Sequence, residues 1–298
     1  MKIKTRTRSV GSFCFDVANY IFLILFSLLM LYPMVNIVAI SLSDKVAVDK
    51  GLVTWLPIGF NLSGYEYMLS YAPLIRSYGM TIAYALGGTI ITLCLTSLIA
   101  YPLSIPNFVL KKHITLYLSV TMFFGGGMVP TYLILQKLKM LNTYWVMVLP
   151  GCVSAYNTFV FRSFFQGIPS ALRESAHVDG AEEITIWWNI ILPLSLPLLA
   201  TYFLFTMVGH WNSWFNALLY LNDEWRYPLQ MILRRLVVED NLTQVYKYDS
   251  AAFSGPKAMH TKNAQMAAVV IAMVPILMVY PFLQKHFAKG VMVGAIKG

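Results

Sequence analysis

Charged residues are scarce in this sequence. Of its 298 residues only 12% are Asp, Glu, Lys or Arg, whereas 58% are hydrophobic, and the mean hydropathy is +0.63. A chain of this size then has too little polar surface to cover a water-soluble globule. The composition excludes an ordinary soluble domain and predicts a protein that faces lipid.

The patterns that usually mark catalytic and metal sites are also missing. The 13 acidic residues form neither a DxD nor an HExxH pattern, and the chain contains no GxxxxGK[ST] phosphate loop and no CxxC pair. His177 and His210 have no partner at metal-ligand spacing. We therefore expect no catalytic residue, no metal site, no cofactor and no ATP hydrolysis in this chain. The three cysteines lie in or beside apolar runs and are interpreted as buried small hydrophobic residues: Cys14, Cys94 and Cys152.

Six charge-free apolar runs are long enough to cross a bilayer as helices, which takes about 20 residues. Because no water satisfies backbone groups in the bilayer core, we expect helices rather than strands. Two runs exceed one span, and each is expected to hold an additional interfacial or re-entrant piece. The sequence thus predicts an all-α membrane protein with about six transmembrane helices, in the runs 17–43, 77–110, 114–136, 141–161, 184–222 and 263–284.

An even number of spans places both termini on one side of the membrane. Basic residues are frequent at both ends, which favours the cytoplasm for the termini. The net charge of +9 comes from Lys and Arg scattered over loops, so it indicates contact with anionic lipid headgroups rather than nucleic acid. The expected division is a tail, first span and outer loop at 1–75, a transmembrane domain at 76–284 and a cytoplasmic tail at 285–298.

Two expected outer loops, 44–76 and 223–262, contain aromatic residues and charges of both signs. Neither loop is of low complexity or rich in like charge, so we favour an ordered surface that contacts a partner over a disordered linker.

The segment 168–193, between the fourth and fifth runs, is the most informative. Pro169 and Ser170 are expected to open a short helix, with Ser170 as its cap. Asp179-Gly180 is a turn pair in which glycine supplies backbone freedom. Asp179 is then expected to cap a second helix, with Glu182 completing a capping box. The pattern predicts a helix, a sharp turn and another helix on the cytoplasmic side.

This segment resembles the EAA loop of ABC importer permeases. It reads Glu174-Ser175-Ala176, three residues, Gly180, nine residues, Ile190, one residue and Leu192-Pro193, which is the family's spacing throughout. Only Ser175 departs from the pattern, since the family has Ala there. The alternative is an ordinary amphipathic interfacial helix.

The resemblance implies a MetI-like permease fold in which this loop couples the spans to a cytosolic ATPase. Glu174 would make polar contacts with the ATPase, Ser175 and Ala176 would allow close approach, and the docking helix would extend to Asp179. Gly180 would give the turn, and the stretch from Ile190 through Leu192-Pro193 would return the chain to the membrane. The implied partners are a second homologous permease forming a heterodimer, an ABC ATPase dimer that holds ATP and Mg, and an extracellular solute-binding protein, all at a bacterial cell membrane.

Further segments are similar to carbohydrate permeases, which are MalG-like and of the LplC and YtcP type: 156–162, 211–216, 227–230 and 289–298. They imply a sugar or oligosaccharide as substrate. Aromatic rings and neutral amides bind sugars without charge. The mid-span candidates for the substrate pathway are therefore Tyr84, Tyr156, Asn157, Trp211, Asn212, Trp214 and Asn216, with helix packing or an interfacial belt as the alternative.

Two other functions compete with a sugar permease. A membrane-embedded glycan enzyme would need converging carboxylates or a metal site. A permease for amino acids, peptides or ions would more often carry a charged residue within a span, where charge is costly and usually functional. The six runs carry none, which favours a neutral substrate, but the sequence does not specify the saccharide.

Overall fold

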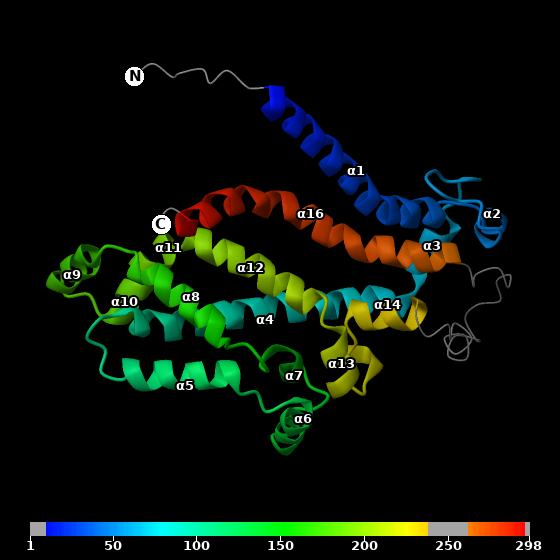
Figure 1. Ribbon diagram of the computed structural model, residues 1–298. Coiled ribbons are helices and arrows are strands. Elements are labelled where there is room, and N and C mark those ends of the chain that lie inside the picture. Colours follow the sequence, from blue (N-terminus) through cyan, green and yellow to red (C-terminus); the bar gives the residue numbers. More distant parts are fainter. Residues whose placement is uncertain (1–9, 238–261, 296–298) are drawn as a thin grey trace. The chain divides into compact units, whose positions relative to one another are not determined.

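The computed structural model describes residues 10–237 and 262–295 (Figure 1). These residues form helices and turns, and no strand occurs among them, as the sequence predicts. The chain divides into two compact units, one made of Met1–Ser70 with Leu242–Ile271 and the other of Tyr71–Asn241 with Ala272–Gly298. Each unit is described by itself.

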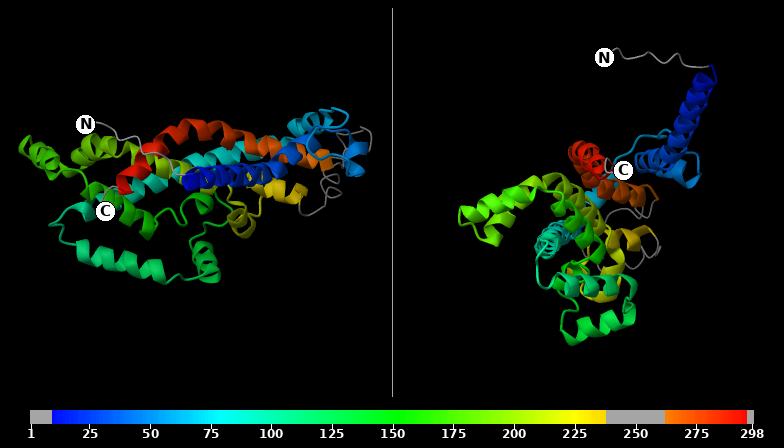
Figure 2. Two further views of the ribbon diagram at one scale, coloured as in Figure 1. Left: turned by 45° about the horizontal axis from the view of Figure 1, so that its top comes forward. Right: turned by 60° about the vertical axis from the view of Figure 1, so that its left-hand side comes forward.

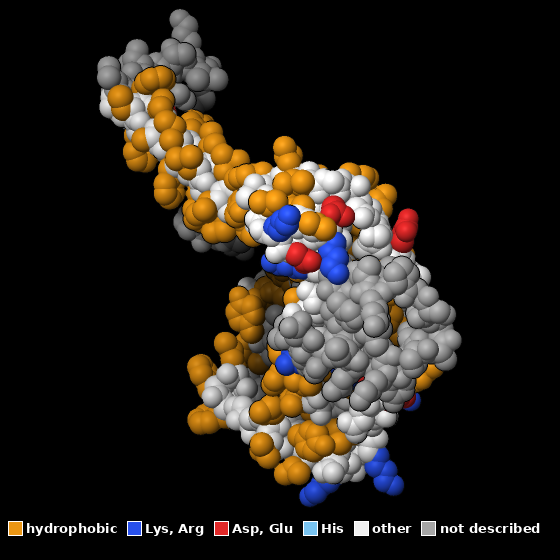
Figure 3. Space-filling view, turned by 90° about the vertical axis from the view of Figure 1, so that its right-hand side faces the viewer, with side chains coloured by type: hydrophobic (Ala, Val, Ile, Leu, Met, Phe, Trp, Pro, Cys, Tyr) orange, Lys and Arg blue, Asp and Glu red, His pale blue; other side chains and the backbone are white. Residues whose placement is uncertain are grey.

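The first unit begins with the long helix α1, Val10–Ser41. Large hydrophobic side chains are exposed along its length, from Phe13 to Val38. Figure 3 shows them as a strip of orange side chains that starts at the grey N-terminal residues. A helix that is apolar on all sides suits a membrane span. Cys14 is exposed on α1 and Cys94 is exposed as well, so the prediction that they are buried is wrong.

The loop after α1, which is expected on the outer side, is ordered, as predicted. It forms α2, Lys45–Asp49, capped by the Asp44 carboxylate, which accepts from the Val46 amide at 3.0 Å, and α3, Ser63–Ser70. A Cβ at Gly64 of α3 would lie 3.2 Å from the Cα of Ala264 in α16, Lys262–Ala295, so glycine permits this close packing. Contact of this loop with a partner stays a prediction. Most of the second predicted outer loop, 238–261, lies outside the described residues.

The second unit is built around α4, Ala72–Ser104, with α8, Ala155–Gln166, and α12, Leu196–Trp211, packed on it (Figure 1). Small and hydroxyl side chains face these neighbours, and a Cβ at Gly88 would collide with the ring of His210 on α12. The run 77–110 forms this single helix, so the additional piece expected there is wrong. The helix ends at Ile105 in extended backbone because Pro106 follows.

Two other runs are broken helices. The run 114–136 was expected as one span, but it forms α5, Lys111–Phe123, and α6, Met128–Lys137, with a bend of 120° between them (Figure 2). Three consecutive glycines, 125–127, lie at the bend, and Gly127 has φ +80°, which side chains disfavour.

The run 184–222 breaks as predicted. It holds three short consecutive helices, α10, η1 and α11, and then α12 after a bend of 81°. After a second break at Asn212 and Ser213 comes α13. The short elements have the bounds α10 Glu183–Ile186, η1 Trp187–Ile191 (a π-helix), α11 Leu192–Leu194 and α13 Trp214–Tyr220.

Among the described residues, α1, α4 and residues 262–279 of α16 are long and apolar enough to cross a membrane, and counting each bent pair as one span gives five. The fourth predicted run, 141–161, forms α7, Trp145–Val148, and the first part of α8, which are too short to span a membrane. The unit is completed by the short helix η2, Glu224–Arg226, and by α14, Leu229–Val237.

Candidate coupling loop and transport pathway

The predicted helix, turn and helix are present. The first is α9, Ser170–Val178, and the second begins with α10 at Glu183. Gly180 has φ +81°. Its amide donates to the His177 carbonyl at 3.0 Å, and the Ala181 amide donates to the Ala176 carbonyl at 2.9 Å. This pair of bonds is the Schellman motif, in which a left-handed glycine satisfies the last carbonyls of a helix.

The predicted caps are wrong. Ser170 is the first helical residue and the cap position is Pro169, with no side-chain cap bond. Asp179 occupies the C-cap of α9 and does not open the next helix, and Glu182 precedes α10 without a side-chain cap bond. The Schellman motif explains the difference, because an Asp-Gly pair that ends a helix reads in sequence like one that starts the next.

The residues of the EAA pattern divide into two groups. Glu174, Ser175, Asp179 and Gly180 are exposed on α9 and its turn, while Ala176 is half-buried and packs on the chain's own core. No residue of α9 is fully buried. The exposed face also carries Val178, which is 88% exposed. This helix therefore presents a mixed polar and apolar surface, with one carboxylate, to the outside of the unit.

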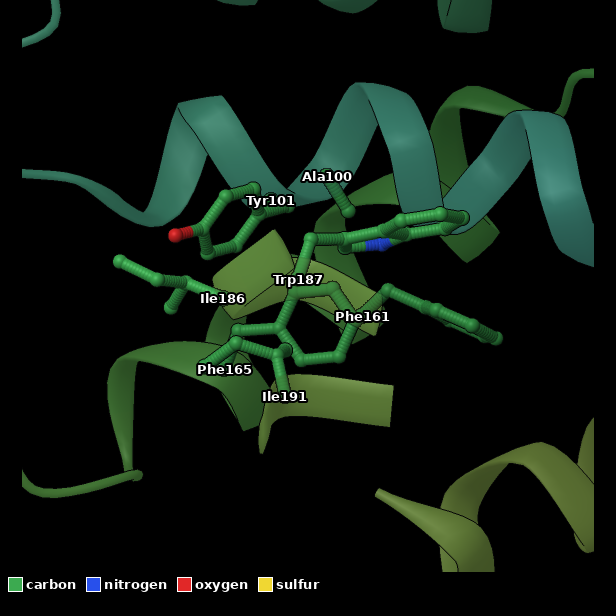
Figure 4. Close-up of a cluster of buried hydrophobic side chains, with 7 residues drawn as sticks. All are labelled: Ala100, Tyr101, Phe161, Phe165, Ile186, Trp187 and Ile191. Atoms are coloured by element: carbon green, nitrogen blue, oxygen red, sulfur yellow. The ribbon is translucent and has the colours of Figure 1, made fainter. Parts of the chain in front are cut away.

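The second group anchors the loop. Ile190 and Leu192 are half-buried against a cluster of buried side chains, and Pro193 is exposed. Figure 4 shows the cluster, in which side chains from α4, α8, α10 and η1 meet. A core of this kind holds the return segment of the loop against the helices of the unit. Its members are Ala100, Tyr101, Phe161, Phe165, Ile186, Trp187 and Ile191.

Glu183 joins α9 to this core through polar contacts. Its carboxylate accepts from the guanidinium of Arg173, with Nε at 3.2 Å from Oε1, and from the hydroxyl of Tyr101, and it lies 3.1 Å from Nε2 of His177. Partial burial opposes ionisation, but these donors outweigh it and lower the pKa of Glu183 to about 2. The network therefore contains a carboxylate at neutral pH.

Sequence reasoning missed this network. Its only signal is the pair of opposite charges, Arg173 and Glu183, on either side of the Asp179-Gly180 turn. Tyr101 is more than 80 residues away in sequence, so only the packing of α4 against the loop brings it there.

Two of the seven candidate pathway residues are buried in the unit. Tyr84 is fully buried, donates to the Arg226 carbonyl at 2.9 Å and stacks on Tyr144 at 5.3 Å between ring centroids. Trp211 is 3% exposed and lines an apolar pocket with side chains of α12 and α16. Both contacts are those of packing residues.

The other candidates are accessible. Asn212, Trp214 and Asn216 are exposed at the break between α12 and α13, where Asn212 Oδ1 accepts from Gln230 at 3.2 Å. The guanidinium of Arg234 lies 5.2 Å from the centre of the Trp214 ring. Tyr156 is exposed and Asn157 half-buried on the first turn of α8. The break thus gathers an aromatic ring, two amides and a cation on one side of the unit.

No group of three or more His, Cys, Asp or Glu side chains suited to a metal ion occurs in the part of the chain that the structure describes. The coupling loop offers contact and charge, from the exposed carboxylates of Glu174, Asp179 and Glu182 and the hydrogen-bonded one of Glu183.

Comparison with known families matches residues 76–293 to the binding-protein-dependent transport system inner membrane component. The chain belongs to this family. As a member of the binding-protein-dependent permeases it is a membrane-embedded transport subunit of a bacterial cell and works with a binding protein. The match runs from the start of the unit built on α4 to near the end of α16 and includes the whole EAA loop.

Two curated relatives of this permease are proteins of Bacillus subtilis strain 168. The polygalacturonan/rhamnogalacturonan transport system permease protein YtcP is 37% identical, and the alignment covers 95% of this chain and 98% of the length of YtcP. Protein LplC is 39% identical, and the alignment covers 100% of this chain and 99% of the length of LplC. YtcP is named as a transport system permease protein, as expected for a chain that is a transport subunit and not an enzyme.

The fold of the permease also matches solved structures. A chain from a bacterial ABC transporter involved in the import of the acidic polysaccharide alginate matches with a TM-score of 0.88 and 30% identity, over 95% of this chain and 100% of that chain. A second chain, from an alginate ABC transporter in complex with a pentasaccharide-bound periplasmic protein, matches with a TM-score of 0.52 and 17% identity over 92% of this chain and 93% of that chain. The MetI-like importer fold is thereby confirmed.

Proposed function

We propose that this permease forms half of a pathway that imports an oligosaccharide and that α9 couples the pathway to a separate ATPase. The observation that carries the proposal is the geometry of α9. Its Glu174 face is exposed, its C-terminal end is fixed by the Schellman motif, and Ile190 and Leu192 of the EAA pattern pack on the buried cluster. A helix that is fixed at its C-terminal end and exposed on its face suits a docking element.

The proposed substrate is a sugar chain. The name of the relative YtcP refers to polygalacturonan and rhamnogalacturonan, and the matched structure belongs to an alginate importer. In this chain the exposed Trp214 ring and the amides of Asn212 and Asn216 offer stacking and hydrogen bonds of the kind that sugars use. Arg234 beside Trp214 adds a positive charge, so acidic oligosaccharides are the first class to test.

The proposed assembly contains a second, homologous permease, an ABC ATPase dimer that binds ATP and Mg, and a solute-binding protein outside the cell. In the proposed orientation both termini and α9 lie in the cytoplasm. The loop that contains α2 and α3 is proposed to lie outside the cell, on the side of the binding protein. ATP hydrolysis belongs to the partner subunits.

The test is to reconstitute the four components in proteoliposomes and to measure ATP hydrolysis stimulated by the loaded binding protein. Glu174→Ala removes the exposed carboxylate and is expected to reduce stimulation by roughly tenfold or more, the loss that accompanies removal of a charged contact. Glu182→Ala is the matched control, because this carboxylate is also exposed but lies beyond the turn.

Unchanged stimulation in an assembled Glu174→Ala complex would contradict the coupling role of α9. The same assay distinguishes the substrate classes. Stimulation by a binding protein loaded with an acidic or neutral oligosaccharide supports sugar import, and stimulation only by one loaded with amino acids or peptides contradicts it.

A further inference from the structure

Helix α9 has few contacts through which a movement can pass to the membrane helices. None of its nine residues is fully buried, and only Ala176 packs on the buried cluster. Its other contacts include those at the chain ends, the turn at Gly180 and the contacts of Arg173 and His177 with Glu183. The polar network therefore provides much of the lateral connection between α9 and the unit.

Glu183 shares its carboxylate between two helices. Arg173 and His177 lie one turn apart on α9, and both contact Oε1 of Glu183, while the Tyr101 hydroxyl donates to Oε2. Hydrogen bonds that involve ionised groups are roughly twice as strong as neutral ones and have defined directions. Arg173 Nε also donates to Oε2, at 3.3 Å. A displacement of α9 therefore acts directly on the carboxylate that α4 holds through Tyr101.

Tyr101 is suited to receive this displacement. Its ring is 6% exposed within the cluster, and its hydroxyl lies at the cluster's edge (Figure 4). It stands in the last turn of α4, a helix of 33 residues, about 50 Å long. Because α4 packs on both α8 and α12, a force applied at its end reaches the centre of the unit.

From these contacts we propose that Glu183 and Tyr101 are positioning residues that transmit the movement of α9 to α4. The proposal rests on the coupling role of α9 proposed above. It adds a route that the EAA pattern does not contain, since neither residue belongs to the pattern. Glu174 makes the contact with the ATPase, and the carboxylate of Glu183 with the hydroxyl of Tyr101 converts that contact into movement of a span.

The test compares transport with ATP hydrolysis in the reconstituted complex. Tyr101→Phe removes only the hydroxyl and keeps the ring in the cluster. We expect normal assembly and stimulated ATP hydrolysis, but roughly 2-fold to 30-fold more ATP hydrolysed per oligosaccharide transported, the range over which mutations along coupled networks act. Glu183→Gln keeps the size of the side chain and is expected to act in the same direction.

Tyr144→Phe is the matched control. The Tyr144 hydroxyl donates to the Ala83 carbonyl of the same helix α4 at 2.7 Å, but far from α9. This variant is expected to keep the wild-type ratio of ATP to substrate. A Tyr101→Phe complex that also keeps the wild-type ratio would overturn the proposal, and so would a loss confined to assembly, which indicates a purely structural contact.

The Glu174→Ala complex separates this proposal from the one on which it rests. If Glu174→Ala abolishes stimulated hydrolysis while Tyr101→Phe and Glu183→Gln leave the ratio unchanged, α9 is the coupling helix and the route through Tyr101 is wrong. If Glu174→Ala has no effect, the coupling role of α9 itself fails.

Discussion

Individual residues of the EAA pattern have two different physical roles that the sequence presents as one motif. The exposed Glu174 and Ser175 face outward, whereas Ile190 and Leu192 pack against the buried cluster. The spacing groups these positions into one predicted motif. It does not show that the small side chain of Ala176 faces the chain's own core, because that depends on which side of a short helix the cluster covers.

The pH dependence of the Glu183 contacts follows from the direction of its pKa shift. The folded pKa of about 2 lies below the ordinary value of 4.5. The network's contribution to stability is therefore present above about pH 4.5 and is lost as the pH falls toward 2. Because the Glu183 side chain is 43% exposed, solvent screening reduces the contribution to about 1 kcal/mol.

Hydrogen exchange of the α9 amides measures this contribution. Glu183→Gln is expected to speed exchange by about fivefold relative to the wild-type chain. This factor is expected to stay the same from pH 8 to pH 5. Below pH 4.5 the exchange rates of the variant and the wild type are expected to converge. Glu182→Gln is the matched control and is expected to leave exchange unchanged. A difference that already disappears between pH 8 and pH 6 would show that Glu183 does not hold its charge in this network.

At the scale of elements, the sequence predicted the kinds of structure better than their ends. The helices of the coupling loop were expected, but the Asp179-Gly180 pair closes α9 instead of opening α10. Asp and Gly are favoured in turns of several types, so the local sequence does not decide between them. The pair ends α9 because the amides of Gly180 and Ala181, the two residues after the cap, donate to the carbonyls of His177 and Ala176.

The broken runs show a similar limit. Apolar length alone predicted one span at 114–136, whereas the three glycines allow the chain to turn by 120°. Glycine permits a bend but does not dictate one, since Gly87 and Gly88 lie inside the continuous α4. Neighbouring helices decide which glycines bend, and these contacts are not visible in the sequence.

The turn after α9 yields a prediction about one backbone position. Gly180 has φ +81°, and a Cβ there would meet no atom within 4 Å, so a substitution introduces backbone strain without a steric clash. Gly180→Ala is expected to weaken the α9 cap by about 1–2 kcal/mol. Gly180→Asn is expected to cost less, because Asn adopts the left-handed conformation more readily.

Limited proteolysis of the loop in the assembled complex provides the measurement. Cleavage is expected to be slowest in the wild type, faster in Gly180→Asn and fastest in Gly180→Ala. Gly79→Ala is the control, since a Cβ there also meets no atom within 4 Å but the residue is helical within α4. Equal cleavage of Gly180→Ala and wild type would mean that the left-handed turn is not present.

At the scale of the whole molecule, composition was enough to predict an all-helical membrane protein, because 58% hydrophobic residues leave few alternatives. The orientation in the membrane depends instead on a balance of basic residues between the two sides. It requires a separate test, since the same set of helices is compatible with either direction.

Cysteine labelling provides that test, because exposed positions exist in loops expected on opposite sides. Val178 on α9 is 88% exposed and Leu56 in the outer loop is 76% exposed. In a chain whose three cysteines are replaced by Ser, a membrane-impermeant maleimide is expected to label Leu56→Cys in right-side-out vesicles and Val178→Cys only in inverted ones. Both positions carry an apolar side chain in a loop, so they are matched in chemistry and differ in the predicted side. The reverse pattern would place α9 outside the cell, where no cytosolic ATPase can reach it. Labelling of both positions from the same side would mean that the chain crosses the membrane an even number of times between them, which contradicts the predicted odd number.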